Sequence, residues 1–269
     1  MLEFSVIMKL LSHSPILICL FPIQFNTKGE ENMPRFILMT VTFIVSLILT
    51  FTSYFMKING QSSLEISNRF PVIFAPFNAS YVIWIVIYML LGYWLVMNIK
   101  KTTIKQTVLF SSICIMQALT IVVWHHELFI VTIASMFILV LYLFLLYNTY
   151  PLSDNSPSGR IPFSIYLAWV TFILMTNVSF TLTSYQWNGF GLSNPLWAVI
   201  LLTIGVAIAL HIRFHHFDIM YPSVFIWSYV GVALHNGLDE LLVTTAALFL
   251  CGVLLVGILF IKKNPAYQK

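Results

Sequence analysis

The sequence predicts an all-α, multipass transmembrane helical bundle of about eight spans, and two observations lead to this prediction. Only 8% of the 269 residues are charged and the mean hydropathy is +0.92, whereas ordinary globular domains carry about 25% charged residues. The apolar residues form continuous runs of about 20, the length at which a helix crosses a bilayer, without the alternation of a barrel strand. A large water-exposed catalytic domain is therefore excluded.

Each expected helix is an apolar run that stops where polar, charged or Pro residues return. In chain order the runs cover residues 36–56, 78–98, 107–124, 127–147, 162–184, 195–212, 217–235 and 241–261. The junction between the third and fourth runs is only three residues long, at 125–127. The seventh run is short and contains Pro222, so its ends are the least sharply marked. The longest connection, residues 57–76, joins the first two helices.

The basic residues indicate how the bundle is oriented. Eight spans put both termini on one side, and Lys and Arg concentrate on the cytoplasmic side of membrane proteins. Of the 13 basic residues, only Lys57 and Arg69 lie outside if the N-terminus is inside. The cytoplasmic set is then Lys9, Lys28, Arg35, Lys100, Lys101, Lys105, Arg160, Arg213, Lys262, Lys263 and Lys269. We expect a cell-membrane protein with both termini cytoplasmic, and no basic stripe for nucleic acid.

Residues 1–32 form an N-terminal extension with an apolar run, 16–25, that is too short to span a bilayer. A signal peptide with Lys9 in its basic region is one interpretation. The alternative is that residues 28–32 can be encoded by a purine-rich ribosome-binding sequence in front of Met33. We expect that native translation starts at Met33 and that residues 1–32 are not translated natively.

The histidines give no enzyme prediction. His211 and His215 belong to an H-x-x-x-H-H string at one end of the sixth helix. The other pair begins at His125, at the opposite end of the third helix, so the two groups lie a bilayer thickness of about 30 Å apart. A local metal site of His211, His215 and Asp218 is the alternative. We expect neither catalytic residues nor a metal site.

Aromatic and amide side chains mark three helices. In the second helix Trp84 and Tyr88 lie four residues apart on one face, followed by Gly92. In the third, Gln117 and Trp124 lie seven apart, again on one face. Polar groups at membrane depth need partners, so such positions carry information about packing or binding.

The fifth helix carries the most specific string, Tyr166-Leu-Ala-Trp169, with Phe172 three residues further and Asn177 eight residues further. Together with the two other helices, this string resembles the TspO/MBR family, the tryptophan-rich sensory proteins whose animal members are the translocator proteins or peripheral benzodiazepine receptors. Ile121 stands where that family has Asn, and no second Pro follows Pro76.

The resemblance divides the chain into the extension 1–32, a five-helix bundle at 33–186 and a three-helix C-terminal extension at 187–269. It implies a pocket under the loop 57–76 that binds a planar hydrophobic ligand, such as a porphyrin or other tetrapyrrole, for a sensory or transport role. Lys57 and Arg69 on that loop are expected to meet ligand carboxylates. The expected ligand-binding residues are Trp84, Tyr88, Gln117, Trp124, Tyr166, Trp169 and Asn177.

Other interpretations stay open at this point. Trp84 and Trp169 are also suited to pure packing, and Gln117 and Asn177 to hydrogen bonds between helices. The chain could instead be a small-solute or lipid-related permease, or a structural subunit without a ligand. No cofactor is required, and the expected partners are a hydrophobic small molecule, membrane lipid and, as a candidate assembly, a second copy in a homodimer. Interfacial anchoring is expected for Trp94, Trp187, Trp197 and Trp227.

Overall fold

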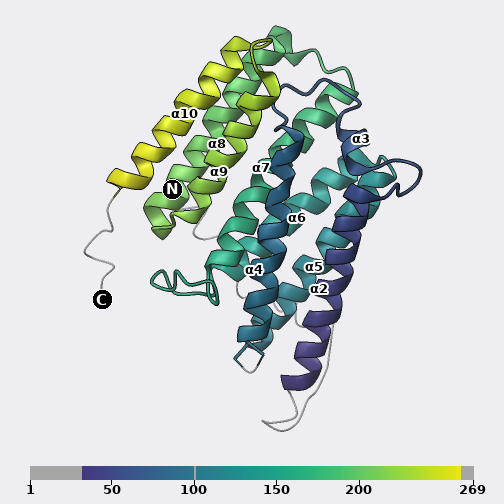
Figure 1. Ribbon diagram of the computed structural model, residues 1–269, viewed down its shortest axis with the longest axis vertical. Helices are drawn as coiled ribbons and strands as arrows, with labels where there is room; N and C mark the ends of the chain where they lie inside the picture. The colour runs from purple at the N-terminus through teal and green to yellow at the C-terminus, as the bar shows by residue number, and fades with distance from the viewer. Residues whose placement is uncertain (1–31, 100, 262–269) are drawn as a thin grey trace.

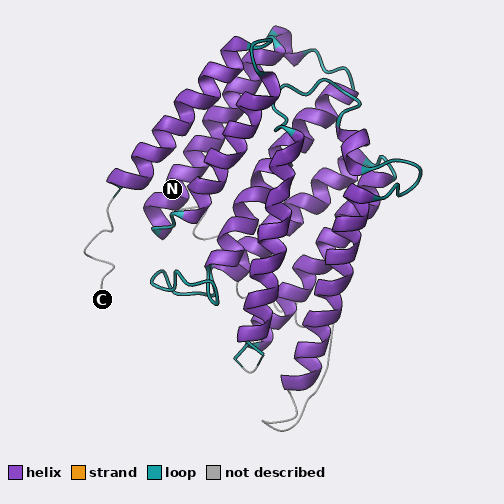
Figure 2. Ribbon diagram, viewed as in Figure 1, coloured by secondary structure: helices purple, strands orange, loops and turns teal. Residues whose placement is uncertain are grey.

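The computed structural model describes residues 32–99 and 101–261, where every regular element is a helix (Figure 2). A short helix, α3 (Ser63–Ser67), and two 3-10 turns, η2 (Asn78–Val82) and η3 (Gly189–Gly191), lie in the connections. The long helices are α2 (Asn32–Phe55), α4 (Ile83–Met97), α5 (Ile104–His125), α6 (Phe129–Tyr147), α7 (Ile161–Ser184), α8 (Asn194–His216), α9 (Met220–Asn236) and α10 (Leu241–Phe260). The predicted all-helical fold is confirmed.

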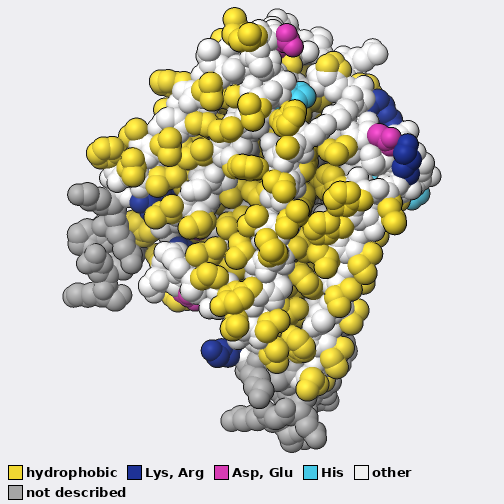
Figure 3. Space-filling model, viewed as in Figure 1, with side chains coloured by type: hydrophobic (Ala, Val, Ile, Leu, Met, Phe, Trp, Pro, Cys, Tyr) yellow, Lys and Arg dark blue, Asp and Glu magenta, His cyan; other side chains and the backbone are white. Residues whose placement is uncertain are grey.

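Seven of the helical segments in the described residues are long and apolar enough to cross a membrane. The eighth long helix, α9, has 17 residues and rises about 25 Å at 1.5 Å per residue. On the face shown in Figure 3, hydrophobic side chains cover the middle of the helices and charged side chains lie towards their ends. The chain is therefore a multipass membrane protein.

The helices form two groups that meet at α7 (Figure 1). In the first group, α2 packs on α5, α5 on α6 and α6 on α7, while α4 also packs against α7. In the second group, α8, α9 and α10 pack against one another, and α9 lies along α7. The predicted boundary between residues 186 and 187 falls in the connection between α7 and α8. The expectation for residues 1–32 lies outside the described residues, apart from Asn32, the first residue of α2.

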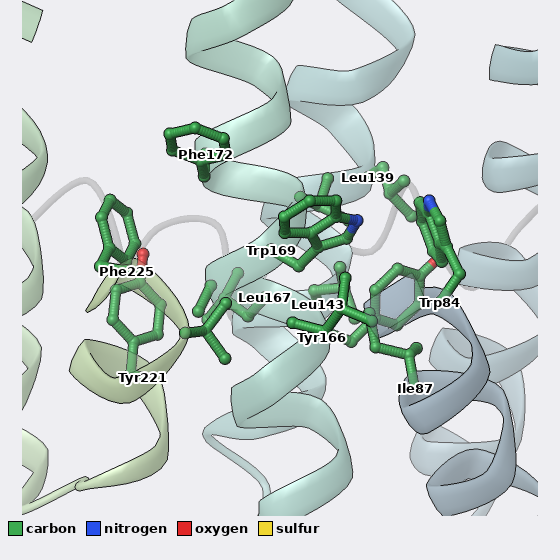
Figure 4. Packing of buried hydrophobic residues seen from close by; sticks show 14 of the residues in the cluster. Trp84, Ile87, Leu139, Leu143, Tyr166, Leu167, Trp169, Phe172, Tyr221 and Phe225 are labelled. Carbon is green, nitrogen blue, oxygen red and sulfur yellow. The ribbon is translucent and has the colours of Figure 1, made fainter. Parts of the chain in front are cut away.

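The helix α7 is apolar around much of its circumference because it has neighbours on both sides. Trp169 has Trp84 of α4 on one side, while Phe225 and Tyr221 of α9 lie on the other side of α7 (Figure 4). Phe172 is fully buried, with ring centroids 6.3 Å from Phe225. The packing of α7 thus joins the two groups of helices.

Trp94 corrects one expectation from the sequence. Instead of anchoring the protein at a membrane interface, it is fully buried. Its ring stacks on Phe110 with centroids 5.0 Å apart, and its Nε1 donates a 2.7 Å hydrogen bond to the hydroxyl of Tyr150. The hydrogen bond to Tyr150 allows the indole to be buried, because a buried indole N–H needs an acceptor.

Candidate ligand cavity

A cavity of about 100 Å³ lies at the end of the first helix group where α2, α5 and α7 end and α4 and α6 begin. Residues from α3 and from the segment that follows it also line the cavity. Its hydroxyl lining consists of Thr50, Ser53, Ser63, Ser67, Thr120, Thr132 and Thr176. Its aromatic lining consists of Tyr54, Tyr81, Trp84, Trp124 and Phe180. The site therefore combines ring faces with neutral hydrogen-bonding groups.

Four of the seven predicted site residues line this cavity: Trp84, Gln117, Trp124 and Asn177. Gln117 and Trp124 share one stripe of α5 with two more lining residues, Thr120 and Ile121, as the spacing of three, four and seven residues requires. The structure thus brings together residues from three helices that are far apart in the sequence.

The other three predicted residues, Tyr88, Tyr166 and Trp169, lie behind the lining. The hydroxyl of Tyr166 donates to Gln117 Oε1 at 3.1 Å, and that of Tyr88 lies 2.6 Å from Thr50 Oγ1. Trp169 is fully buried and packs edge to face against Trp84, with centroids 6.4 Å apart. These residues position the lining instead of forming it.

Three aromatic lining residues were not predicted, Tyr54, Tyr81 and Phe180. The hydroxyl of Tyr54 accepts a 3.1 Å hydrogen bond from Trp84 Nε1, and the rings of the two tyrosines lie 5.5 Å apart. Tyr81 precedes Trp84 by three residues, and this spacing was a usable signal for a shared face. Tyr54 has no such signal, because nothing in the spacing of α2 relates it to the other helices.

The loop 57–76, which we call the lid, covers the cavity and is fastened to the rest of the protein along its first half. Within this half, Ser62 and Glu65 form a capping box at the start of α3, which orders a helix of only five residues. Across the lid, Asn59 Nδ2 donates to the carbonyl of His125 at 3.2 Å, and the Ser63 hydroxyl lies 3.1 Å from His125 Nε2. The first half of the lid is thus docked on the end of α5.

The two cations of the lid pair with carboxylates of the chain, where ligand carboxylates were expected. Arg69 makes a bidentate contact with Glu127, Nη1 to Oε2 at 2.8 Å and Nη2 to Oε1 at 2.9 Å. The ammonium of Lys57 lies 2.8 Å from Glu65. The hydrogen bond from Arg69 lowers the pKa of the Glu127 carboxyl and raises the pKa of the guanidinium.

The helix α9 holds the second half of the lid and the turn that follows it. Asn236 Nδ2 donates to the carbonyl of Ile73 at 2.8 Å, and the amide of Phe77 donates to the carbonyl of Gly231 at 2.9 Å. Trp227 Nε1 donates to the carbonyl of Ser80 at 3.0 Å. The helix α9 therefore contacts the lid and the start of η2 directly.

The histidines predicted to be non-catalytic lie at the two ends of the bundle. His211 and His215 are one turn apart on α8, with ring centroids separated by 4.3 Å. Asp218 is occupied elsewhere, since it accepts from the hydroxyl of Tyr147 at 2.6 Å and from the backbone amide of Met220 at 2.8 Å. Within the described residues, no three His, Cys, Asp or Glu side chains gather as a metal site.

Comparison with known proteins identifies the family. The family model described as TSPO-like protein matches residues 36–260, which is well over half of the chain. No curated protein and no solved structure matches it. The matched range begins in α2 and ends at the last residue of α10, so it includes the C-terminal helices. The chain belongs to the TSPO-like family.

Proposed function

We propose that this TSPO-like membrane protein binds a planar hydrophobic ligand, a porphyrin or a ring system of similar shape, in the cavity beneath the lid. One observation carries the proposal: five aromatic side chains border a cavity that no side chain of the described residues fills. Aromatic faces favour offset or edge contacts with other rings, each contributing about 0.5–1.5 kcal/mol beyond the burial of area.

The membrane setting explains why rings and hydroxyls would select the ligand. A hydrophobic compound is already dissolved among lipid tails, so moving it into a protein adds little hydrophobic free energy. Preference must come from ring contacts and from a few hydrogen bonds. The lining supplies both, through residues such as Trp84, Trp124 and Gln117.

The size of the cavity implies that the lid moves when a large ligand enters. Pockets for drug-sized ligands measure about 300–1,000 Å³, against about 100 Å³ here. One ion pair, Arg69 with Glu127, joins the lid to the end of α5, and a second, Lys57 with Glu65, lies within the lid; their side chains are about a third or more exposed. Pairs of this kind are worth only about 0–1 kcal/mol each, so breaking them to open the lid costs little.

The attachment of the second half of the lid to α9 supports a sensory role. The contacts of Ile73 and Phe77 with α9 would carry a change in the lid to the C-terminal helices. In the proposed orientation, with both termini on the cytoplasmic side of a cell membrane, the lid faces the outside. A ligand bound there would then alter helices that reach the cytoplasmic face.

The experiment is a titration of the detergent-purified protein with protoporphyrin, followed by quenching of tryptophan fluorescence. Trp84→Phe replaces the indole that lines the cavity by a smaller ring and removes the Nε1 donor to Tyr54. We expect saturable quenching by the wild-type protein and about 3–10-fold weaker binding by this variant, because the larger indole face and the hydrogen bond that holds it are lost.

The matched control is Trp187→Phe. Trp187 lies in the connection after α7, where its ring packs on Trp197 with centroids 5.1 Å apart, and it does not line the cavity. Its affinity for protoporphyrin should equal that of the wild type. Quenching that does not saturate, or equal loss in both variants, would count against binding in this cavity.

A further inference from the structure

The charged residues around the cavity indicate whether it accepts charged or uncharged ligands. This inference rests on the proposed function. Among the described residues that line the cavity, none is Lys, Arg, His, Asp or Glu. The nearest cations on the lid, Arg69 and Lys57, are already paired with Glu127 and Glu65. His125 contacts the lining residue Ser63 without lining the cavity itself. A ligand inside the cavity therefore meets no unpaired charge from these groups.

Most of the Ser and Thr hydroxyl groups in the lining already donate their proton to another group of the protein. Five of them donate to a backbone carbonyl three or four residues earlier in their own helix, over distances of 2.7–3.1 Å. These five are Ser53, Ser67, Thr120, Thr132 and Thr176. A hydroxyl has one proton and two acceptor lone pairs. What these groups can still offer to the cavity is therefore acceptors.

Thr50 adds a sixth acceptor by the same reasoning. The hydroxyl of Tyr88 donates to the carbonyl of Ser46 at 3.1 Å, so the proton in its 2.6 Å contact with Thr50 comes from Thr50. Donors remain on at least five lining residues. Gln117 keeps its Nε2 group because Oε1 accepts from Tyr166, and Tyr54 keeps its own proton because it accepts from Trp84. Asn177 Nδ2 donates only one of its two protons, to the carbonyl of Ile173, and the Tyr81 hydroxyl and Trp124 Nε1 are further donors.

We propose that the cavity selects uncharged planar ligands that carry hydrogen-bond donors, and discriminates against the same ring system when it bears carboxylates. An ionised carboxylate offers only acceptors. In this cavity it would meet neutral hydrogen-bonding groups but no counter-ion, and burial of an unpaired charge is strongly unfavourable. A ligand N–H or O–H group, in contrast, meets the hydroxyl oxygens of the lining as acceptors.

The test compares protoporphyrin with its dimethyl ester in the fluorescence titration, since the two share one ring and differ in the two carboxylates. We expect the ester to bind the wild-type protein at least about tenfold more tightly. Protoporphyrin binding as tightly as the ester would overturn the inference while leaving the proposed function in place. If neither compound gives saturable quenching, both the inference and the proposed function fail.

A variant tests whether the pairing of Arg69 with Glu127 causes the discrimination against carboxylates. Glu127→Gln frees the charge of Arg69 and loosens the lid for both compounds alike, so only the ratio of the two affinities is informative. We expect the preference for the ester to fall at least about threefold. Asp239→Asn removes an exposed carboxylate outside the lid and should leave the ratio unchanged. A ratio that does not change in Glu127→Gln would contradict the assigned role of the Arg69 pair.

Discussion

The two groups of helices use the same kinds of residue in different ways. Around the cavity, rings from α2, α4, α5 and α7 surround a space bordered by hydroxyls. Among the C-terminal helices, rings fill the space: Tyr229 and Phe225 of α9 pack where Gly205 of α8 has no side chain, and a Cβ there would collide with both. In this protein, aromatic side chains thus leave a cavity where small polar side chains keep the rings apart.

The largest effect on the contact between the two groups of helices is expected at Phe172, which packs between them. Its ring lies 6.3 Å from Phe225, 6.4 Å from Tyr229 and 5.3 Å from Phe74 of the lid. Replacing a buried Phe by Ala typically costs about 3–5 kcal/mol, so Phe172→Ala should lower the free energy of unfolding by about that amount, as measured in detergent. Phe249→Ala on α10, 72% exposed, is the control and should change little.

A second substitution tests whether α9 supports the lid. A Cβ on Gly231 would collide with Ser80 Oγ and lie 3.1 Å from Pro76 Cβ. Gly231→Val should therefore cost about 1–3 kcal/mol and expose the lid to proteolysis or hydrogen exchange. On α10, a Cβ on Gly252 meets nothing within 4 Å, so Gly252→Val should leave both readouts unchanged. Equal lid exposure in the two variants would contradict the support from α9.

A smaller effect is expected behind the cavity wall. Tyr166→Phe removes the donor to Gln117 Oε1, a bond inside the helix bundle. Such bonds contribute about 1 kcal/mol, and the variant should lose about that much stability in a denaturant titration. The freed Gln117 amide should also change the affinity for porphyrin. A loss of several kcal/mol would instead mean that the ring of Tyr166 is misplaced.

The smallest expected effect is at the surface of the lid. The folded-state pKa of Glu127 is lowered, first by its hydrogen bond from Arg69, so the pair stabilises the protein above the unfolded pKa of about 4.3. This stabilisation is lost as the pH falls through the lower folded value. Glu127→Gln should reduce stability at pH 7 by no more than about 0.5 kcal/mol. The Tm difference from wild type should shrink as the pH falls through the lowered folded-state pKa of Glu127, and its persistence below that pKa would exclude a charge effect.

Much of the fold could be predicted because each span is a long apolar run. The seventh predicted run, 217–235, corresponds to α9 at Met220–Asn236, and its ends were least certain because polar residues and Pro222 interrupt the hydropathy. The five-residue helix α3 went unnoticed, although Ser62-x-x-Glu65 is a capping-box sequence.

The site could be predicted only in part. On α5, Gln117 and Trp124 share a single stripe, so helical spacing places both in the lining. On α7, spacing cannot tell which ring faces the cavity, because this helix is packed on several sides; Trp169 accordingly lies behind Trp84. The Arg69–Glu127 pair joins residues 58 apart, a separation for which no local pattern exists.

The central claim, that the ligand occupies this cavity, is tested most directly by filling the cavity. Ile121 lines it from α5, whereas Ile115 on the same helix is 54% exposed. Titration of Ile121→Trp with protoporphyrin dimethyl ester should show binding weakened by more than about tenfold while the Tm is kept or raised, and Ile115→Trp should bind like the wild type. Undiminished binding by a stably folded Ile121→Trp protein would contradict the account.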